Sequence, residues 1–164
     1  MDEFIHLLEM HGIALLTDIR TIPHSRHNPQ FEQEALAQAL EARHIGYRHM
    51  KALGGLRHPR KDSQNEGWRN GGFRGYADYM QTDGFRHALD DLIMLGRRQP
   101  VAIMCAESVP WRCHRSLVAD ALAIRHISVY HIFPDGKATP HQLTSFAHVD
   151  GQRITYPAAQ PVLL

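Results

Sequence analysis

The sequence is poor in lysine and has no long apolar run. Of its 18 basic residues only Lys51, Lys61 and Lys137 are lysines, and the other 15 are arginines. The formal net charge is only +1, so no global field draws the protein onto nucleic acid or a membrane. No apolar stretch approaches the roughly 18 residues of a membrane span, and no export signal opens the chain. We therefore expect a cytoplasmic protein that does not contact membranes.

Cysteine is also scarce, with Cys105 and Cys113 as the two examples. Two cysteines fit a reduced protein better than the disulfide scaffold of a small secreted domain. A zinc site built from Cys105, Cys113 and His114 stays open, but adjacent ligands rarely share one ion and no C-x-x-C pair supports it. The 13 histidines are dispersed and show no pair at a zinc-like spacing on a convincing helix. We therefore expect neither a metal nor a cofactor.

The chain is long enough, at 164 residues, for one domain with its own core. Apolar patterning alternates between helix and strand, which is typical of helices covering both faces of a parallel sheet. The expected fold is a single three-layer Rossmann-like α/β domain, over residues 1–164, with a mostly parallel sheet. The expected strands are 13–19, 47–53, 101–104 and 129–133, and the main expected helices are 2–10, a segment starting at residue 29, 83–98 and a segment following residue 115.

Two segments lack periodicity, a long loop at 54–75 and a C-terminal tail at 150–164. A loop this long inside a compact domain is usually functional or mobile. Its arginines stand beside aromatic residues, a combination that suits a nucleic-acid surface through charge and stacking but is also found in solvated loops. The residues concerned are Arg57, Arg60, Arg69, Arg74, Trp68, Phe73 and Tyr76.

Reactive side chains follow two of the expected strands. Because the carboxyl ends of parallel strands meet at one edge of a sheet, the loops 18–26 and 105–115 should face each other across a crevice. The second loop leads into a helix, whose free N–H groups favour an anion. A salt-bridge network that only holds the loops together is the alternative reading. The crevice residues are Asp18, Arg20, Ser25, Arg26, Cys105, Glu107, Cys113, His114 and Arg115.

Three chemistries can be tested on this crevice. Cysteine phosphatases and rhodaneses place a thiolate at a strand end with an arginine closing an anion cradle, but Cys105 and Arg112 are one residue too far apart. Pro110 and Trp111 also replace small residues that such a cradle needs. The zinc site is the second option. The third, which we favour, holds an anion with arginines and the helix start and uses acid/base groups nearby.

Four motifs resemble the domain-of-unknown-function 488 family: D-I-R-x-x-P-x-S-R-x-N-P-x-F, L-G-G, F-x-x-Y-x-x-Y-M and M-C-A-E-x-x-P-x-x-C-H-R. The similarity runs from about residue 4 to residue 141. It implies a compact cytoplasmic α/β protein and no established activity. The residues that the family pattern marks are Asp18, Arg20, Pro23, Ser25, Arg26, Gly54, Gly55, Tyr76, Cys105, Glu107, Cys113, His114 and Arg115.

The chain departs from the family pattern at its start. Members usually open with a strand ending in a T-I-G-H or T-I-G-Y turn, whereas this chain begins at Met1 inside what would be the following helix. Either the start codon is placed late, or one strand and one loop of the site are missing. A missing strand would uncover a sheet edge, which a second copy of the chain could cover to form a homodimer.

Together these observations predict an enzyme-like domain that binds a phosphate-bearing ligand, a nucleotide or a nucleic-acid end, between loops 18–26 and 105–115. Whether it is catalytic is open. The alternative is a non-catalytic nucleic-acid-binding module that uses residues 57–76. The predicted acid/base or nucleophilic residues are Asp18, Cys105, Glu107 and His114, and the predicted ligand-binding residues are Arg20, Ser25, Arg26, Tyr76, Cys113 and Arg115.

Overall fold

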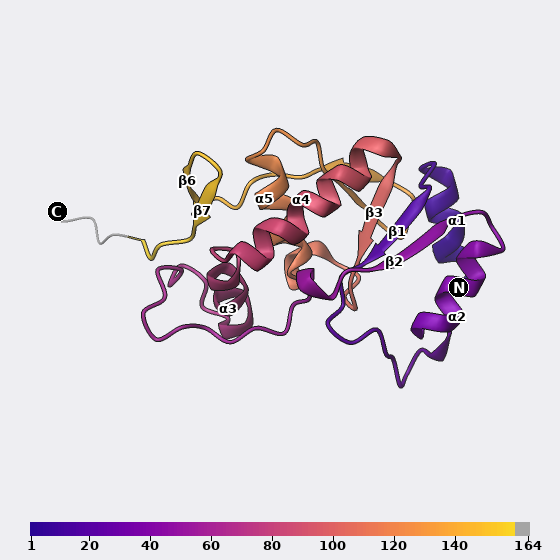
Figure 1. Cartoon of the computed structure of the whole chain (residues 1–164), viewed down its shortest axis with the longest axis horizontal. Coiled ribbons are helices and arrows are strands. Elements are labelled where there is room, and N and C mark those ends of the chain that lie inside the picture. The colour runs from indigo at the N-terminus through magenta and orange to yellow at the C-terminus, as the bar shows by residue number, and fades with distance from the viewer. Residues whose placement is uncertain (160–164) are drawn as a thin grey trace.

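A computed structural model of the chain, which describes residues 1–159, has a mixed α/β fold built on a three-stranded parallel sheet (Figure 1). The central strand β1 (Leu15–Asp18) pairs with β2 (Gly46–His49) on one side and β3 (Val101–Met104) on the other. All four residues of β1 are buried, as expected for a strand covered on both faces. The register puts the last residues of the three strands side by side, so the loops that follow them start at the same edge.

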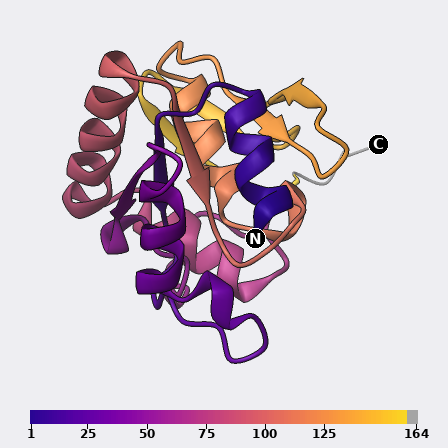
Figure 2. The same cartoon turned by 90° about the vertical axis from the view of Figure 1, so that its right-hand side faces the viewer.

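Helices cover both faces of this sheet (Figure 2). Leu16 and Met104 pack with α1 (Asp2–Met10) and α2 (Gln33–Glu41) on one face. On the other face the core gathers the apolar sides of three further helices, α3 (Gly71–Tyr79), α4 (Asp83–Arg98) and α5 (Arg115–Ala123). Helices therefore pack on both faces of the parallel strands. None of the helices within residues 1–159 is long and apolar enough to cross a membrane.

The expected fourth strand, 129–133, does not join the parallel sheet. Its residues form β4 (Tyr130–Ile132), which pairs antiparallel with β5 (Ala138–Pro140). The turn at Asp135-Gly136 accounts for this difference. Gly136 takes a φ of 80°, which is typical of a tight turn that reverses the direction of the chain. The strand therefore turns back on its neighbour in sequence instead of crossing over to the sheet.

The expected C-terminal tail is also partly structured. Residues within 150–164 contribute to a second antiparallel pair, β6 (His148–Asp150) and β7 (Arg153–Thr155). Ile154 and Tyr156 are buried in the main core. The remainder of the expected tail, residues 160–164, lies outside the described residues.

The loop expected at 54–75 is shorter than predicted, because α3 begins at Gly71. Asn70 caps this helix, and its side-chain oxygen accepts from the N–H groups of Gly72 at 2.8 Å and Phe73 at 3.2 Å. Because glycine has a low helix propensity, the two glycines at the start of α3 do not predict a helix there.

Helix α2 begins later than expected. The helix expected from residue 29 opens with a short 3-10 turn, Pro29–Phe31, and becomes α-helical only at Gln33.

Buried polar groups hold the remaining loop in place. The carboxylate of Asp78, on α3, accepts from the N–H of Arg60 at 2.8 Å, from Ser63 Oγ at 2.7 Å and from Asn65 Nδ2 at 2.7 Å. Asn65 is itself buried and accepts from the N–H of Tyr156 at 2.9 Å. The loop is therefore pinned to α3 and to the segment after β7.

Replacing Asp78 by alanine tests this account. The change leaves buried donors without partners, so we expect the free energy of unfolding to fall by about 3 kcal/mol. The control is Asp62→Ala, which removes only an exposed ion pair with Arg60 and should leave the free energy of unfolding nearly unchanged. Urea denaturation measures both, and equal losses in the two variants would contradict the pinning role.

Candidate functional site

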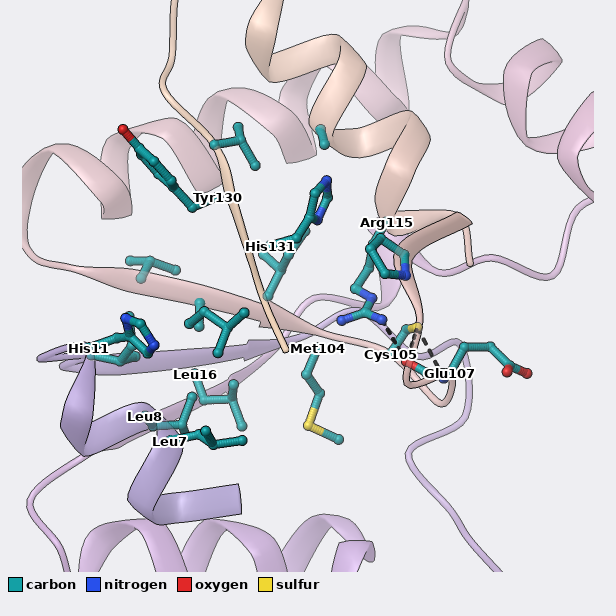
Figure 3. Close-up of a pocket in the computed structure, with 18 of the residues that line it drawn as sticks. Leu7, Leu8, His11, Leu16, Met104, Cys105, Glu107, Arg115, Tyr130 and His131 are labelled. Carbon is teal, nitrogen blue, oxygen red and sulfur yellow. Dashed lines mark hydrogen bonds between the residues drawn. The ribbon is translucent and has the colours of Figure 1, made fainter. Parts of the chain in front are cut away.

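A cavity of about 810 Å³ runs along the free side of β3 (Figure 3). Side chains of α1, α4 and the segment 127–133 line it together with β3, and most of this lining is apolar. Its polar end lies at the carboxyl ends of β1 and β3. The predicted residues Arg20, Ser25, Cys105, Glu107 and Arg115 all line the cavity.

The two loops meet because their strands are neighbours. Asp18 is in register with Met104, and the N–H of Ile19 donates to the carbonyl of Met104 at 2.9 Å. The chain leaves both strands at this edge, so residues about 85 positions apart in sequence, Arg20 and Cys105, line one cavity.

Asp18 and Arg20 form a buried ion pair at the floor of this edge. Arg20 Nε donates to both carboxylate oxygens of Asp18, at 2.9 and 3.0 Å, and its Nη1 donates to the carbonyl of Phe31 at 2.9 Å. Burial alone would lower the pKa of Arg20, but the hydrogen bonds to Asp18 and its charge raise it. The guanidinium is therefore a fixed cation with one side toward the cavity.

Asp18 has no capacity left for acid/base work in this arrangement. It is 0% exposed and accepts five hydrogen bonds, four from Arg20 and the fifth from Tyr47 Oη at 2.7 Å. Burial, followed by the bond to Asp18, raises the pKa of Tyr47. The sequence analysis predicts acid/base chemistry for Asp18, whereas this geometry agrees with a role in orienting Arg20. Tyr47 was missed, since nothing in its local sequence separates it from an ordinary strand aromatic.

Arg115 faces the same end of the cavity from the first turn of α5. Its Nη2 donates to the carbonyls of Glu107 at 2.6 Å and Ser108 at 3.2 Å. Its Nε is buried and has no hydrogen-bond partner within residues 1–159. Burial lowers the pKa of Arg115. The carboxylate of Glu107 is exposed and extends away from the cavity in Figure 3.

The two cysteines are paired, which corrects the expectation of free thiols. Their sulfur atoms are in contact, with the Cα atoms 7.2 Å apart. Each sulfur also accepts a backbone N–H, that of Glu107 for Cys105 at 3.2 Å and that of Arg115 for Cys113 at 3.4 Å. The loop that joins β3 to α5 folds back on itself and brings them together. Among the described residues no group of three His, Cys, Asp or Glu side chains is placed to hold a metal ion.

His114, Cys113 and Tyr76 lie behind the cavity and not in its lining. His114 Nε2 donates to the carbonyl of Ile19 at 3.1 Å, and its ring lies 4.9 Å from the ring of Tyr76. Tyr76 is fully buried and donates to the carbonyl of Leu53 at 2.8 Å. Gly55 packs directly on the imidazole, where a Cβ atom would collide with Nδ1. The L-G-G motif thus serves close packing around His114.

Arg26 lies outside this arrangement. It is exposed, does not line the cavity and makes no hydrogen bond or ion pair within the described part of the chain. Ser25, beside it, does line the cavity, and its Oγ accepts from the N–H of Asn28 at 3.1 Å.

Comparison with known families gives one match. The family described as Domain of unknown function DUF488 matches residues 1–122. The chain belongs to this family. Searches of curated proteins and of solved structures find no match.

The DUF488 match covers the parallel sheet and both loops of the polar end, but not the whole cavity. The wall formed by residues 127–133 lies beyond the matched residues. Any chemistry carried by that wall therefore belongs to this chain and is not assigned by the family.

The buried imidazole of His114 makes stability depend on pH. Burial lowers the pKa of His114 from 6.5 to about 4. The unfolded chain takes up a proton below pH 6.5 and the folded chain does not until about pH 4. This contribution to stability is complete above pH 6.5 and is lost as the pH falls toward 4, by up to about 3 kcal/mol.

We therefore expect His114→Gln to show a smaller loss of unfolding free energy between pH 7 and pH 4 than the unaltered protein. Urea denaturation at a series of pH values measures the slope. The exposed His87, changed to Gln, is the control and should keep the original slope. An unchanged slope in His114→Gln would contradict the buried neutral imidazole.

Proposed function

We propose that the polar end of the cavity binds a phosphate-bearing ligand, with Arg115 and Arg20 holding the anion. The observation that carries this proposal is the buried Nε of Arg115, which has no partner within residues 1–159 although it borders a cavity. Arginine presents donors in a planar fork that matches phosphate and carboxylate oxygens. An incoming anion would satisfy the unpaired donor and compensate the burial of the charge.

Preorganisation supports the same assignment. The contacts of Arg20 with Asp18 and Phe31 hold its guanidinium in one geometry before any ligand arrives. A site whose cations are already ordered loses less entropy on binding. The carboxylate of Asp18 neutralises the charge of Arg20, so Arg20 and Arg115 together with Asp18 carry a net charge of about +1 and not +2.

The reactive groups of this proposal are Cys105 and Glu107, since Asp18 is saturated and His114 lies behind the cavity. Cys105 stands at the end of β3 and lines the cavity. Cys105 and Cys113 are paired in the structure, so Cys105 can react only after this pair is reduced, and we propose a cytoplasmic setting whose reducing environment would reduce it. Cys105 would then be a nucleophile or proton donor, and Glu107 an acid/base group after a loop movement.

The alternative, a nucleic-acid surface at residues 57–76, receives less support. Arg57 lies over the ring of Tyr79 at 3.5 Å, Arg60 pairs with Asp62, and Arg74 donates to the carbonyl of Trp68. The ring of Trp68 packs against the partly exposed Phe146 and against Tyr156 of the core. Most of the side chains that suggested this surface are thus engaged within the protein.

Binding of inorganic phosphate, measured by isothermal titration calorimetry, tests the main proposal. Loss of a hydrogen-bonded charge costs about 1.5–3 kcal/mol, so Arg115→Ala should weaken binding by about 10- to 100-fold. Arg26→Ala is the matched control, because Arg26 lies outside the cavity, and should leave the affinity within about twofold. Equal affinities in the unaltered protein and Arg115→Ala would refute the anion site.

We also propose that a second copy of the chain covers the free edge of β3. Leu15 and Ile19 donate to the carbonyls of Pro100 and Met104, so the alternate residues Val101 and Ile103 direct their N–H and C=O groups away from β1. The apolar part of the cavity lies along this edge. An unpaired edge with an apolar surround favours addition of another strand.

Light scattering after size-exclusion chromatography tests the dimer. Ile103→Pro removes an N–H from the free edge and not from the β1 ladder, so we expect a folded monomer. Ala102→Pro, on the side facing β1, should unfold the protein instead. A monomeric unaltered protein would exclude the dimer without affecting the phosphate site.

A further inference from the structure

A buried carboxylate outside the predicted site collects an unusual number of donors. Asp120, on α5, is 0% exposed. It accepts from His141 Nε2 at 2.8 Å, from the N–H and Oγ1 of Thr144 at 3.1 and 2.7 Å, and from Tyr156 Oη at 2.8 Å. Burial and the charge of Asp120 raise the pKa of Tyr156, which stays a donor. Four donors around two oxygens require the ionised carboxylate.

This arrangement bears on the tautomers of two histidines, His141 and then His131, which are hydrogen-bonded one after the other. Because Asp120 can only accept, Nε2 of His141 carries a proton, and Nδ1 of His141 accepts when that ring is neutral. Its partner is Nε2 of His131, at 2.8 Å, which therefore donates. The remaining ring nitrogen of His131, Nδ1, is left with a free lone pair and has no hydrogen-bond partner within residues 1–159. A chain of hydrogen bonds thus runs from a buried anion to an imidazole base.

The base end of this chain opens on the cavity of the proposed function. His131 lines the cavity, whereas Asp120 and His141 do not. Figure 3 shows the His131 ring on the same side of the cavity as Arg115. Burial, then the proximity of His141 and Arg115, lowers the pKa of His131, and Asp120 opposes this effect. His141, Arg115 and Asp120 act on the ring through their charges, and burial together with His141 and Arg115 favours its neutral form.

We propose that His131 is the proton-exchanging residue of the cavity, acting on the phosphate group held by Arg115, with His141 and Asp120 as positioning residues. The inference rests on the proposed phosphate site and specifies its chemistry. When a phosphate monoanion binds, its hydroxyl proton passes to Nδ1 of His131. The O–H electron pair stays on the oxygen, so the products are a phosphate dianion and an imidazolium. The imidazolium then donates through Nε2 to His141, which remains bonded to Asp120.

The arrangement has a physical advantage for a phosphate ligand. In the empty site the neutral imidazole adds no further positive charge beside Arg115. In the bound site the new imidazolium faces the dianion, and its charge is shared toward Asp120 along two short hydrogen bonds. Binding and protonation therefore favour each other, and the coupling acts equally in both directions.

Histidine NMR on the full chain tests this inference, with inorganic phosphate as the probe. Long-range ¹H–¹⁵N spectra report both the tautomer and the protonation of each ring, and His131→Gln assigns the signal. We expect the free protein to show the Nε2–H tautomer at His131. Saturating phosphate should raise the pH midpoint of this ring by at least about one unit, which is about a tenfold coupling. The exposed His148 is the control and should not shift.

The affinity of His131→Gln provides a second readout that a purely structural role would not produce. We expect its phosphate affinity to be about tenfold weaker than that of the unaltered protein at pH 5.5 and similar at pH 8.5. An equal loss at both pH values would show a structural role and overturn the inference.

The possible failures are distinguishable. If phosphate binds in an Arg115-dependent manner but the His131 midpoint does not move, or if the ring is the Nδ1–H tautomer, the inference is wrong and the phosphate site stands. If calorimetry detects no phosphate binding at all, both are wrong.

Discussion

The buried ion pair between Asp18 and Arg20 is the interaction on which the polar end of the molecule depends. It lies at the end of the central strand, and it ties three segments together: Tyr47 of β2 donates to the carboxylate, and Arg20 donates to the carbonyl of Phe31 ahead of α2. A buried charge is tolerated only when it is paired and hydrogen-bonded. Removing either partner would leave an uncompensated charge inside the sheet layer. A substitution of Asp18 or Arg20 would therefore change both the geometry of the polar end and the stability of the fold.

The cavity combines two kinds of surface that have different consequences. Along β3 its lining is apolar and borders an unpaired strand edge, which favours another polypeptide segment. At the end of the strand it is polar and carries two arginines, which favours an anion. Both surfaces border β3, the edge strand of the parallel sheet, and α1 and α4 line the cavity beside it. Any segment that occupied the apolar part would also narrow the access to Arg115.

Asp120 shows how a single buried carboxylate can organise a region outside the parallel sheet. It joins α5 to the segment after β5 through His141 and Thr144, and to the segment after β7 through Tyr156. These are contacts across 21 to 36 positions of sequence. The two antiparallel pairs are too short to be stable alone. Their attachment to the α/β core therefore depends on this cluster and on the apolar packing of Ile154 and Tyr156.

The sequence by itself determined the central parallel strands and the meeting of loops 18–26 and 105–115, because a continuous apolar run is a local signal of a strand buried on both faces. It did not determine the start of α3 or the β6–β7 pair, since neither follows from propensity or apolar periodicity. Only the tertiary structure decided that Asp18 is saturated, that Arg26 lies outside and that the cysteines meet. It alone joined Asp120 to His131 through His141. These outcomes depend on long-range contacts, and no local pattern encodes which distant donor reaches a buried carboxylate.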